Sequence, residues 1–111
     1  MKIDVEGGEL DVLRGGSRTL SRQLPFLYCE AYETWQAAFG YAPRDLLDFA
    51  RSLGYTAARV FSQGEVHPIR LDEVVSKELF TTSADILFFA DKHSAAVERF
   101  DRRYDVHTNS R

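Results

Sequence analysis

The sequence lacks several features that would assign it to a class at once. Cysteine occurs once, at Cys29, so an internal disulfide is excluded and a reducing compartment is expected. No stretch approaches the roughly 20 apolar residues that a membrane helix needs, and no amino-terminal apolar run resembles a signal peptide. We therefore expect a cytoplasmic protein that does not act at a membrane.

Basic residues are neither in excess nor clustered. Fourteen Lys and Arg stand against 17 Asp and Glu, which gives a net charge of −3, and apart from Arg102-Arg103 the basic residues are scattered. A nucleic-acid surface is therefore disfavoured. The histidines His67, His93 and His107 lack the spacing of metal ligands, so we expect them to be solvated at the surface and predict no metal site.

The apolar content suffices for one folded domain. Hydrophobic residues make up 44% of the 111 residues and charged residues 28%, a balance that argues against disorder. A chain of this length holds one domain at most. We expect that domain over residues 1–104, followed by a frayed polar tail over residues 105–111.

The first nine residues carry the most informative pattern. Ile3 and Val5 are β-branched and favour a strand, and Gly7-Gly8 ends that strand at the start of a helix. The acids that crowd this turn are Asp4, Glu6 and Glu9. A strand that passes through a glycine turn into a helix is typical of open α/β sheets, which bind ligands outside the carboxyl ends of such strands.

Further strands and helices follow from hydrophobic periodicity and from Gly and Pro positions. Strands are predicted at residues 26–31, 55–61, 65–69 and 85–90, and helices at 8–14, 17–24, 43–53, 71–79 and 94–104. The strand at 65–69 contains Pro68, which favours a sheet edge. The aromatic segment 32–42 has no clean period and is interpreted as a loop.

The opening run resembles a known family signature. Residues 2–15 read K-I-D-V-E-G-G-E-L-D-V-L-R-G, which is similar to the K-I-D-x-E-G-x-E, two helical turns and L-x-G of the FkbM family of S-adenosylmethionine-dependent methyltransferases. Later features agree in order: the strand from Pro25 to Glu30, the Leu53-Gly54-Tyr55 step into a strand, and the strand at 85–90. The resemblance covers roughly residues 1–90.

The resemblance implies the class I methyltransferase fold, a sheet in the strand order 3-2-1-4-5-7-6 with strand seven antiparallel. Residues 1–5, 26–31, 55–61 and 86–90 would then be strands four, five, six and seven. The expected architecture is α/β, a partial Rossmann-like mixed sheet of about four strands in the order 4-5-7-6 with flanking helices. Strands one to three would be missing, together with the glycine-rich turn and the acid that bind the cofactor.

The resemblance also implies an activity, methyl transfer from S-adenosylmethionine to oxygen in a small-molecule or sugar hydroxyl. The cofactor contacts assigned to this chain are Asp4, Val5 and Gly7. Because one wall of the cofactor crevice would be absent, we expect the chain not to bind the cofactor alone. On this hypothesis it is the carboxyl-terminal part of a methyltransferase, separated by truncation or a shifted start.

Three acids are candidate catalytic residues. Methyl transfer to a hydroxyl needs a group that takes or shares its proton, and a carboxylate at a strand end could do this or hold a divalent metal that does. The candidates are Asp4, Glu6 and Glu30, with Asp4 and Glu30 about 5 Å apart if they end neighbouring parallel strands. The alternatives are helix capping for Asp4 and Glu6, and a structural bond to a backbone amide or a cation for Glu30.

Aromatic residues follow the second predicted strand. Tyr32 and Trp35 are the candidate acceptor-pocket residues, and Phe39 and Tyr41 lie close behind them in the sequence. The alternative role for all four is packing over the end of the sheet. Cys29, inside an apolar strand, is expected to be an inert core residue.

A second functional hypothesis is a non-catalytic binding or scaffold remnant of the same fold. If strand one is missing, the strand at residues 1–5 has an unpaired edge, and such an edge invites pairing with another chain. Both hypotheses therefore predict self-association through residues 1–5.

Overall fold

The computed structural model describes residues 2–3, 8–32, 37, 40–73, 75 and 77–104. In these residues the strands are β1 (Lys2–Ile3), β2 (Leu27–Ala31), β3 (Ala57–Ser62), β4 (Glu65–Arg70) and β5 (Ala84–Phe89). The helices are α1 (Glu9–Gly15), α2 (Ser17–Gln23), α4 (Pro43–Leu53) and α5 (Ser94–Arg103), with 3-10 helices η1 (Lys77–Phe80) and η2 (Asp91–His93). The predicted tail at 105–111 lies outside the described residues, so the domain boundary there stays a prediction.

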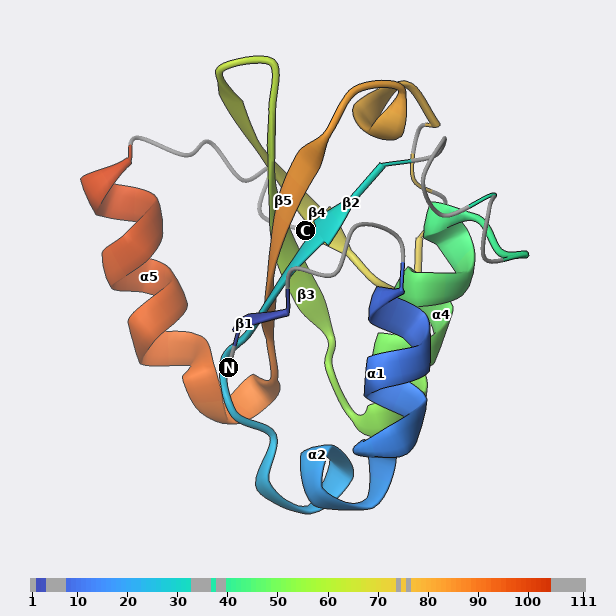
Figure 1. The fold of residues 1–111 in the computed structure, drawn as a ribbon. Helices are drawn as coiled ribbons and strands as arrows, with labels where there is room; N and C mark the ends of the chain where they lie inside the picture. The colour runs from blue at the N-terminus through green and yellow to red at the C-terminus, as the bar shows by residue number, and fades with distance from the viewer. Residues whose placement is uncertain are drawn as a thin grey trace.

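The strands of the described residues form one mixed sheet in the order β1-β2-β5-β3-β4 (Figure 1). β1 runs parallel to β2, whereas β5 is antiparallel to both β2 and β3. β2 and β3 therefore run in the same direction, with the last strand of the chain between them. The α/β class is confirmed, and the four expected strands lie in the expected order. The hairpin strand β4, predicted at residues 65–69, is a fifth strand beside the four that the resemblance implies.

β4 lies at the edge of the sheet, as Pro68 predicted, and pairs only with β3 among the described strands. The hairpin turns at Gln63 and Gly64, whose φ angles of 53° and 78° are both positive. Positive φ at both central residues is typical of the two-residue hairpin turn whose twist matches that of the flanking strands.

The predicted helix over residues 71–79 is wrong in its extent, since the 3-10 helix η1 covers only Lys77–Phe80. Tertiary hydrogen bonds hold the segment instead. The Leu71 N–H bonds the carbonyl of Thr56 at 3.1 Å, and the Ser62 hydroxyl donates to the carbonyl of Leu79 at 3.0 Å. These bonds tie both ends of the segment to the β3 region, and its described residues before Lys77 form turns, a bend and irregular structure.

The main core lies between the sheet and the helices α1, α2 and α4, which Figure 1 shows on one side of it. Alternate residues of the three inner strands point into this layer because side chains alternate along a strand. Those that are at most 1% exposed are Leu27, Cys29, Ala31, Ala58, Val60, Ala84, Ile86 and Phe88. Cys29 is fully buried, so its prediction as a core residue is confirmed.

Helix α4 begins and ends where its Pro and Gly predicted. Pro43 is the first residue, and the Asp45 carboxylate accepts a hydrogen bond from the Ala42 N–H at 2.9 Å, which caps the first turn. Gly54 ends the helix with a φ of 119°. A Cβ at Gly54 would also lie 3.2 Å from the Leu24 side chain, so both backbone and packing favour glycine there.

Tyr55, directly after α4, fixes the chain where it enters β2. Its hydroxyl donates to the carbonyl of Pro25 at 2.5 Å, and the residue is only 1% exposed. Burial, with a smaller effect from the neighbouring Cys29 thiol, raises the pKa of Tyr55 to about 12. The phenol is therefore neutral and serves as a donor at neutral pH.

Helix α5 covers the opposite face of the sheet, over β3 and β5 (Figure 1). A bidentate ion pair joins α5 to β3. The Arg59 guanidinium donates one hydrogen bond to each carboxylate oxygen of Asp101, at 2.8 and 2.7 Å. The Arg59 side chain is only 6% exposed. Phe100 adds edge-to-face contacts with Phe61 and Phe89. This face is thus held by one buried charge pair and an aromatic cluster.

The expectation of a solvated His93 is wrong. Its ring stacks on Phe26 with centroids 4.2 Å apart, and its Nδ1 accepts the Ala90 N–H at 2.9 Å. Burial, and then the charge of Lys92, lower the pKa of His93 below its ordinary 6.5. This contact could not be predicted from the sequence because Phe26 is distant along the chain. His67 is half-buried, and His107 lies outside the described residues.

A pH-dependent stability follows from His93. Its pKa is lowered in the folded state, so the unfolded chain takes up the proton first, and the stabilising contribution is complete above about pH 6.5 and lost as the pH falls through the folded-state pKa. We expect urea titrations to show the free energy of unfolding decreasing over that range. His93→Asn keeps an acceptor for the Ala90 N–H but cannot titrate, and should remove this decrease. His67→Asn is the control and should keep it, whereas an unchanged profile in His93→Asn would contradict this role.

Candidate functional site

Many of the predicted site residues lie outside the described part of the chain. These are Asp4, Val5, Glu6, Gly7 and Trp35, and their roles stay predictions. The described residues Glu30 and Tyr32 remain, both half-buried at or just after the end of β2. The structure therefore describes Glu30, Tyr32 and the residues around the candidate site, and not the site as a whole.

The strands β1 and β2 each precede a predicted site residue in the sequence. They are parallel, with Lys2 opposite Tyr28 and Ile3 opposite Cys29. Ile3 is the residue before the predicted acid segment, and Cys29 is the residue before Glu30. Ile3 and Cys29 therefore lie side by side near the carboxyl ends of the two strands, the end at which open α/β sheets bind ligands.

Glu30 lies on the α5 side of the sheet. Its neighbours Cys29 and Ala31 are buried in the main core, so the alternation along β2 turns Glu30 to the opposite face. There it lies directly opposite Asp85 of β5 in the antiparallel pair. Both carboxylic residues are half-buried. Two acids directly opposite each other on one face of a sheet repel each other when both are ionised.

Asp85 was not predicted as a site residue. In the sequence it is simply the polar first residue of an apolar run, and its pairing with Glu30 depends on β5 entering the sheet beside β2. The same face carries Tyr28, with the Lys2 ammonium 6.0 Å from its ring centroid. A cation at the start of this face and two acids further along give it a polar character that the core face lacks.

Tyr41 contacts the start of α1 on the other side of the sheet. Its hydroxyl accepts a hydrogen bond from the Leu10 N–H, in the first turn of α1, at 3.1 Å. Its side chain is half-buried against the main core. The packing alternative is therefore confirmed for Tyr41. Tyr32 is half-buried, and Phe39 lies outside the described residues.

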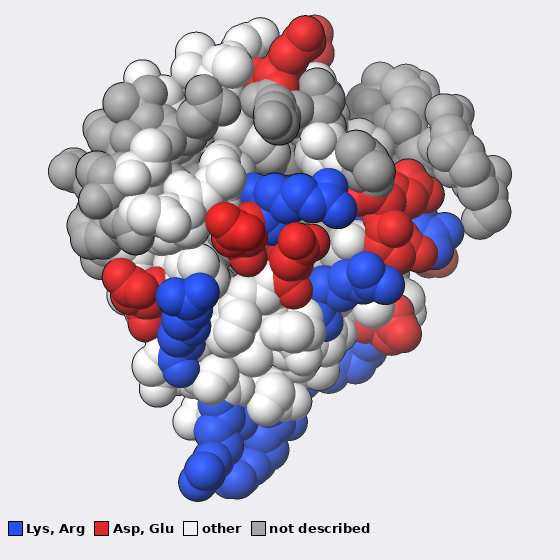
Figure 2. All heavy atoms as spheres, turned by 90° about the vertical axis from the view of Figure 1, so that its right-hand side faces the viewer, with Lys and Arg blue, Asp and Glu red and all other residues white. Residues whose placement is uncertain are grey.

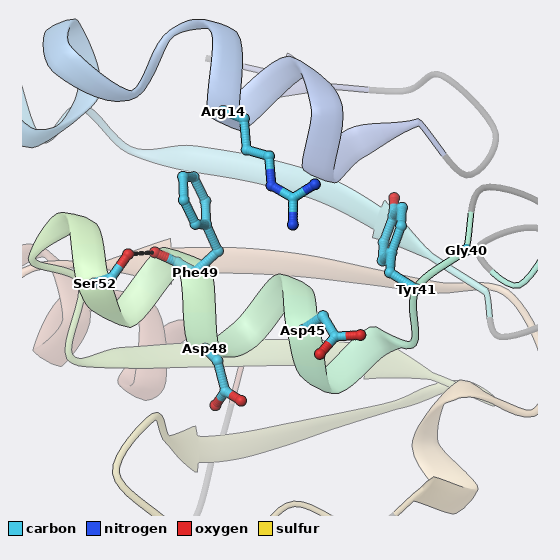
Figure 3. Close-up of a pocket in the computed structure, with 7 residues that line it drawn as sticks. All are labelled: Arg14, Gly40, Tyr41, Asp45, Asp48, Phe49 and Ser52. Atoms are coloured by element: carbon cyan, nitrogen blue, oxygen red, sulfur yellow. Dashed lines mark hydrogen bonds between the residues drawn. The ribbon is translucent and has the colours of Figure 1, made fainter.

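An open groove lies between α1 and α4, with a volume of about 440 Å³. Figure 3 shows the Arg14 side chain extending from α1 into this space, between the rings of Phe49 and Tyr41. The remaining lining residues are Gly40, Asp45, Asp48 and Ser52. The groove is on the helix side of the sheet and Glu30 on the other, so this groove is not the place where Glu30 would act.

The surface over these helices carries charges of both signs. Figure 2 shows Lys and Arg interspersed with Asp and Glu across this face, and Lys and Arg alone at its lower end, where Figure 1 places α2. Two ion pairs join neighbouring turns of these helices. Arg14 pairs with Asp11 in α1 at 3.9 Å, and Arg44 pairs with Asp48 in α4 at 3.7 Å. All four side chains are more than half exposed, so each pair contributes at most about 1 kcal/mol.

Within the described ranges, no cluster of three or more His, Cys, Asp or Glu residues could hold a metal ion. None of the helices in that part of the chain is long and apolar enough to cross a bilayer.

Comparison with known families gives one match. A family model described as the methyltransferase FkbM domain matches residues 1–57, just over half of the 111-residue chain. The matched part contains β1, α1, α2, β2 and α4, and ends at the first residue of β3. No curated protein and no solved structure matched the chain significantly.

The Glu30–Asp85 pair makes a prediction about stability. Asp85→Asn removes one charge from two acids that lie directly opposite each other, and we expect it to raise the free energy of unfolding by about 0.2–1 kcal/mol at neutral pH. The gain should shrink at high salt, because ions screen the repulsion. Urea unfolding at two salt concentrations measures both effects. Asp72→Asn, which removes an exposed acid near Arg70, is the control and should not stabilise the fold; a destabilised Asp85→Asn would show that the pair is not repulsive.

Proposed function

The chain belongs to the FkbM methyltransferase family, and we propose that it forms one wall of a site for methyl transfer from S-adenosylmethionine to the oxygen of a small-molecule or sugar hydroxyl. The observation that carries the proposal is the arrangement of β1, β2, β5 and β3. Their order, with β5 antiparallel between two strands of one direction, agrees with strands 4-5-7-6 of the class I methyltransferase fold. Strand order and the family match are independent observations, and both support the same fold.

In this proposal, acids at the carboxyl end of β1 and β2 act on the acceptor. Asp4, Glu6 and Glu30 are the catalytic candidates, and one of their carboxylates takes or shares the hydroxyl proton as the oxygen attacks the methyl group. Asp4, Val5 and Gly7 contact the cofactor, and Tyr32 and Trp35 border the acceptor. The parallel register that sets Ile3 opposite Cys29 supports a common location for Asp4 and Glu30.

The described residues do not fit the whole cofactor. β1 has a paired strand on its β2 side only, within the described part of the chain. A crevice at the switch point of such a sheet needs walls on both sides of this strand. We therefore propose that the described strands supply the acceptor wall and not the main cofactor wall.

The free side of β1 also supports a proposal about association. A strand with one unpaired edge is a template for another strand, and the described sheet leaves β1 in that position. We propose that this edge pairs with another chain, either a second copy or the polypeptide that carries the missing wall. A cytoplasmic location is part of the same proposal and is supported by the single cysteine.

Titration of the isotope-labelled chain with S-adenosylmethionine, followed by amide NMR, tests the proposed function. We expect binding weaker than about 1 mM, since one wall gives few contacts. The shifts should concentrate at the carboxyl end of β1 and β2, at Ile3, Ala31 and Tyr32, and leave the distant β4 unchanged. ATP, which shares the adenosine but has no sulfonium or amino acid, is the control ligand.

Two outcomes would contradict parts of the proposal. Shifts that are absent from this end of the sheet, or equally large with ATP, would contradict a methyltransferase site and favour the scaffold alternative. Tight saturable binding would contradict the missing wall and leave the methyltransferase function standing.

A further inference from the structure

The strand β4 ends the described sheet, and one of its two edges has no paired strand there. The other edge pairs with β3 in a regular antiparallel register, from Ser62 opposite Glu65 to Ala57 opposite Arg70. An unpaired strand edge offers its backbone N–H and C=O groups to any other strand. Which groups β4 offers follows from its register with β3.

The register decides which backbone groups of β4 point away from β3. Opposed residues in an antiparallel pair alternate between those that exchange hydrogen bonds and those that do not. Ser62 and Glu65 flank the two-residue turn and form a bonded pair. Beyond the other end of β4, the Leu71 N–H bonds the Thr56 carbonyl at 3.1 Å, in step with the same alternation. The outward-pointing residues of β4 are therefore Val66, Pro68 and Arg70.

Pro68 occupies the middle one of these three outward positions. Proline has no backbone N–H, so this edge lacks its central hydrogen-bond donor. The donors that remain, at Val66 and Arg70, are about 13 Å apart along the strand at the usual rise per residue. A proline at position 67 or 69 would instead remove a bond to β3. Pro68 thus weakens the outer edge of β4 and leaves the hairpin with β3 intact.

Charge does not protect this edge. If the β4 strands of two copies paired antiparallel, centred on Pro68, each Arg70 would lie opposite Val66 of the other copy. Arg70 also pairs with Asp72 at 3.0 Å in its own chain, which offsets its charge. At the centre, however, the two prolines would face each other where opposed residues normally exchange two N–H···O bonds, and both bonds would be missing. The missing donors therefore oppose the pairing of two β4 strands.

We infer that Pro68 closes the outer edge of β4 to a second copy of this chain, so that of the two outer strands of the described sheet only β1 can accept another strand. The inference concerns association and does not depend on the proposed methyl transfer. Its consequence is a limit on the size of an assembly. A sheet with one open edge stops at a pair of copies, whereas two open edges allow copies to add without end.

Pro68→Thr tests the inference, because threonine supplies the missing N–H and favours strands. Two added N–H···O bonds per symmetric pair should tighten self-association at least about tenfold relative to the wild-type chain, measured by analytical ultracentrifugation over a concentration series. Pro68→Ala restores the N–H without a β-branched side chain and should also associate more tightly than the wild type. His67→Thr is the matched control. It introduces threonine at the neighbouring position, where the N–H points to β3, and should associate as the wild type does.

Amide hydrogen exchange locates the new contact. In Pro68→Thr the amides at positions 66, 68 and 70 should exchange at least about tenfold more slowly at high than at low protein concentration. Pairing through β1 is common to the wild type and to every variant, so the difference between them reports on β4 alone. Association of both Pro68 variants no tighter than that of the wild type would overturn the inference. Equal tightening in His67→Thr, or protection away from these three positions, would overturn it as well.

Discussion

The insertion of β5 between β2 and β3 is the constraint on which the rest of this structure depends. β5 is the last strand in the chain, yet it pairs with both earlier strands, and its inward residues Ala84, Ile86 and Phe88 are at most 1% exposed. Without β5, β2 and β3 would have no strand between them to pair with. The helices α1 and α4 would then lose part of the sheet surface against which they pack. Residues 58–89 thus complete the sheet that the matched residues 1–57 begin.

The same insertion shapes the candidate site. It sets Asp85 directly opposite Glu30, so the charge around this candidate acid depends on a strand that lies outside the matched family region. On the other side of the sheet, the Tyr41 hydroxyl accepts a hydrogen bond from the Leu10 N–H in the first turn of α1. These are two long-range contacts, one on each face of the sheet. Both connect elements that are far apart in the sequence.

Much of the fold could be predicted from the sequence because its signals are local. Pro43 and Gly54 set the limits of α4, and the apolar runs identify β2 and β5. Local signals also predicted the edge strand with Pro68. The helix predicted at residues 71–79 was wrong in its extent because tertiary hydrogen bonds, rather than hydrophobic periodicity, determine the backbone conformation there.

The candidate site was less predictable, for a physical reason. The acid segment after β1 follows from the sequence pattern, but the neighbours of a side chain depend on register and on packing between distant elements. The pairing of Glu30 with Asp85, the contact of His93 with Phe26 and the bond from Leu10 to Tyr41 are all of this kind. The residue types of Tyr41 and Glu30 made both residues candidates for a role in the site. Whether such a residue packs against its neighbours or takes part in a reaction depends on the three-dimensional arrangement, which the residue type does not show.

The central claim is that β1 lies parallel to β2, so that Ile3, which precedes the predicted acids, lies opposite Cys29, which precedes Glu30. Nuclear Overhauser effects between the backbones of the two strands test it most directly. The account predicts the pattern of parallel neighbours, with Lys2 against Tyr28 and Ile3 against Cys29. An antiparallel pattern, or no contact between these residues, would contradict the proposed site.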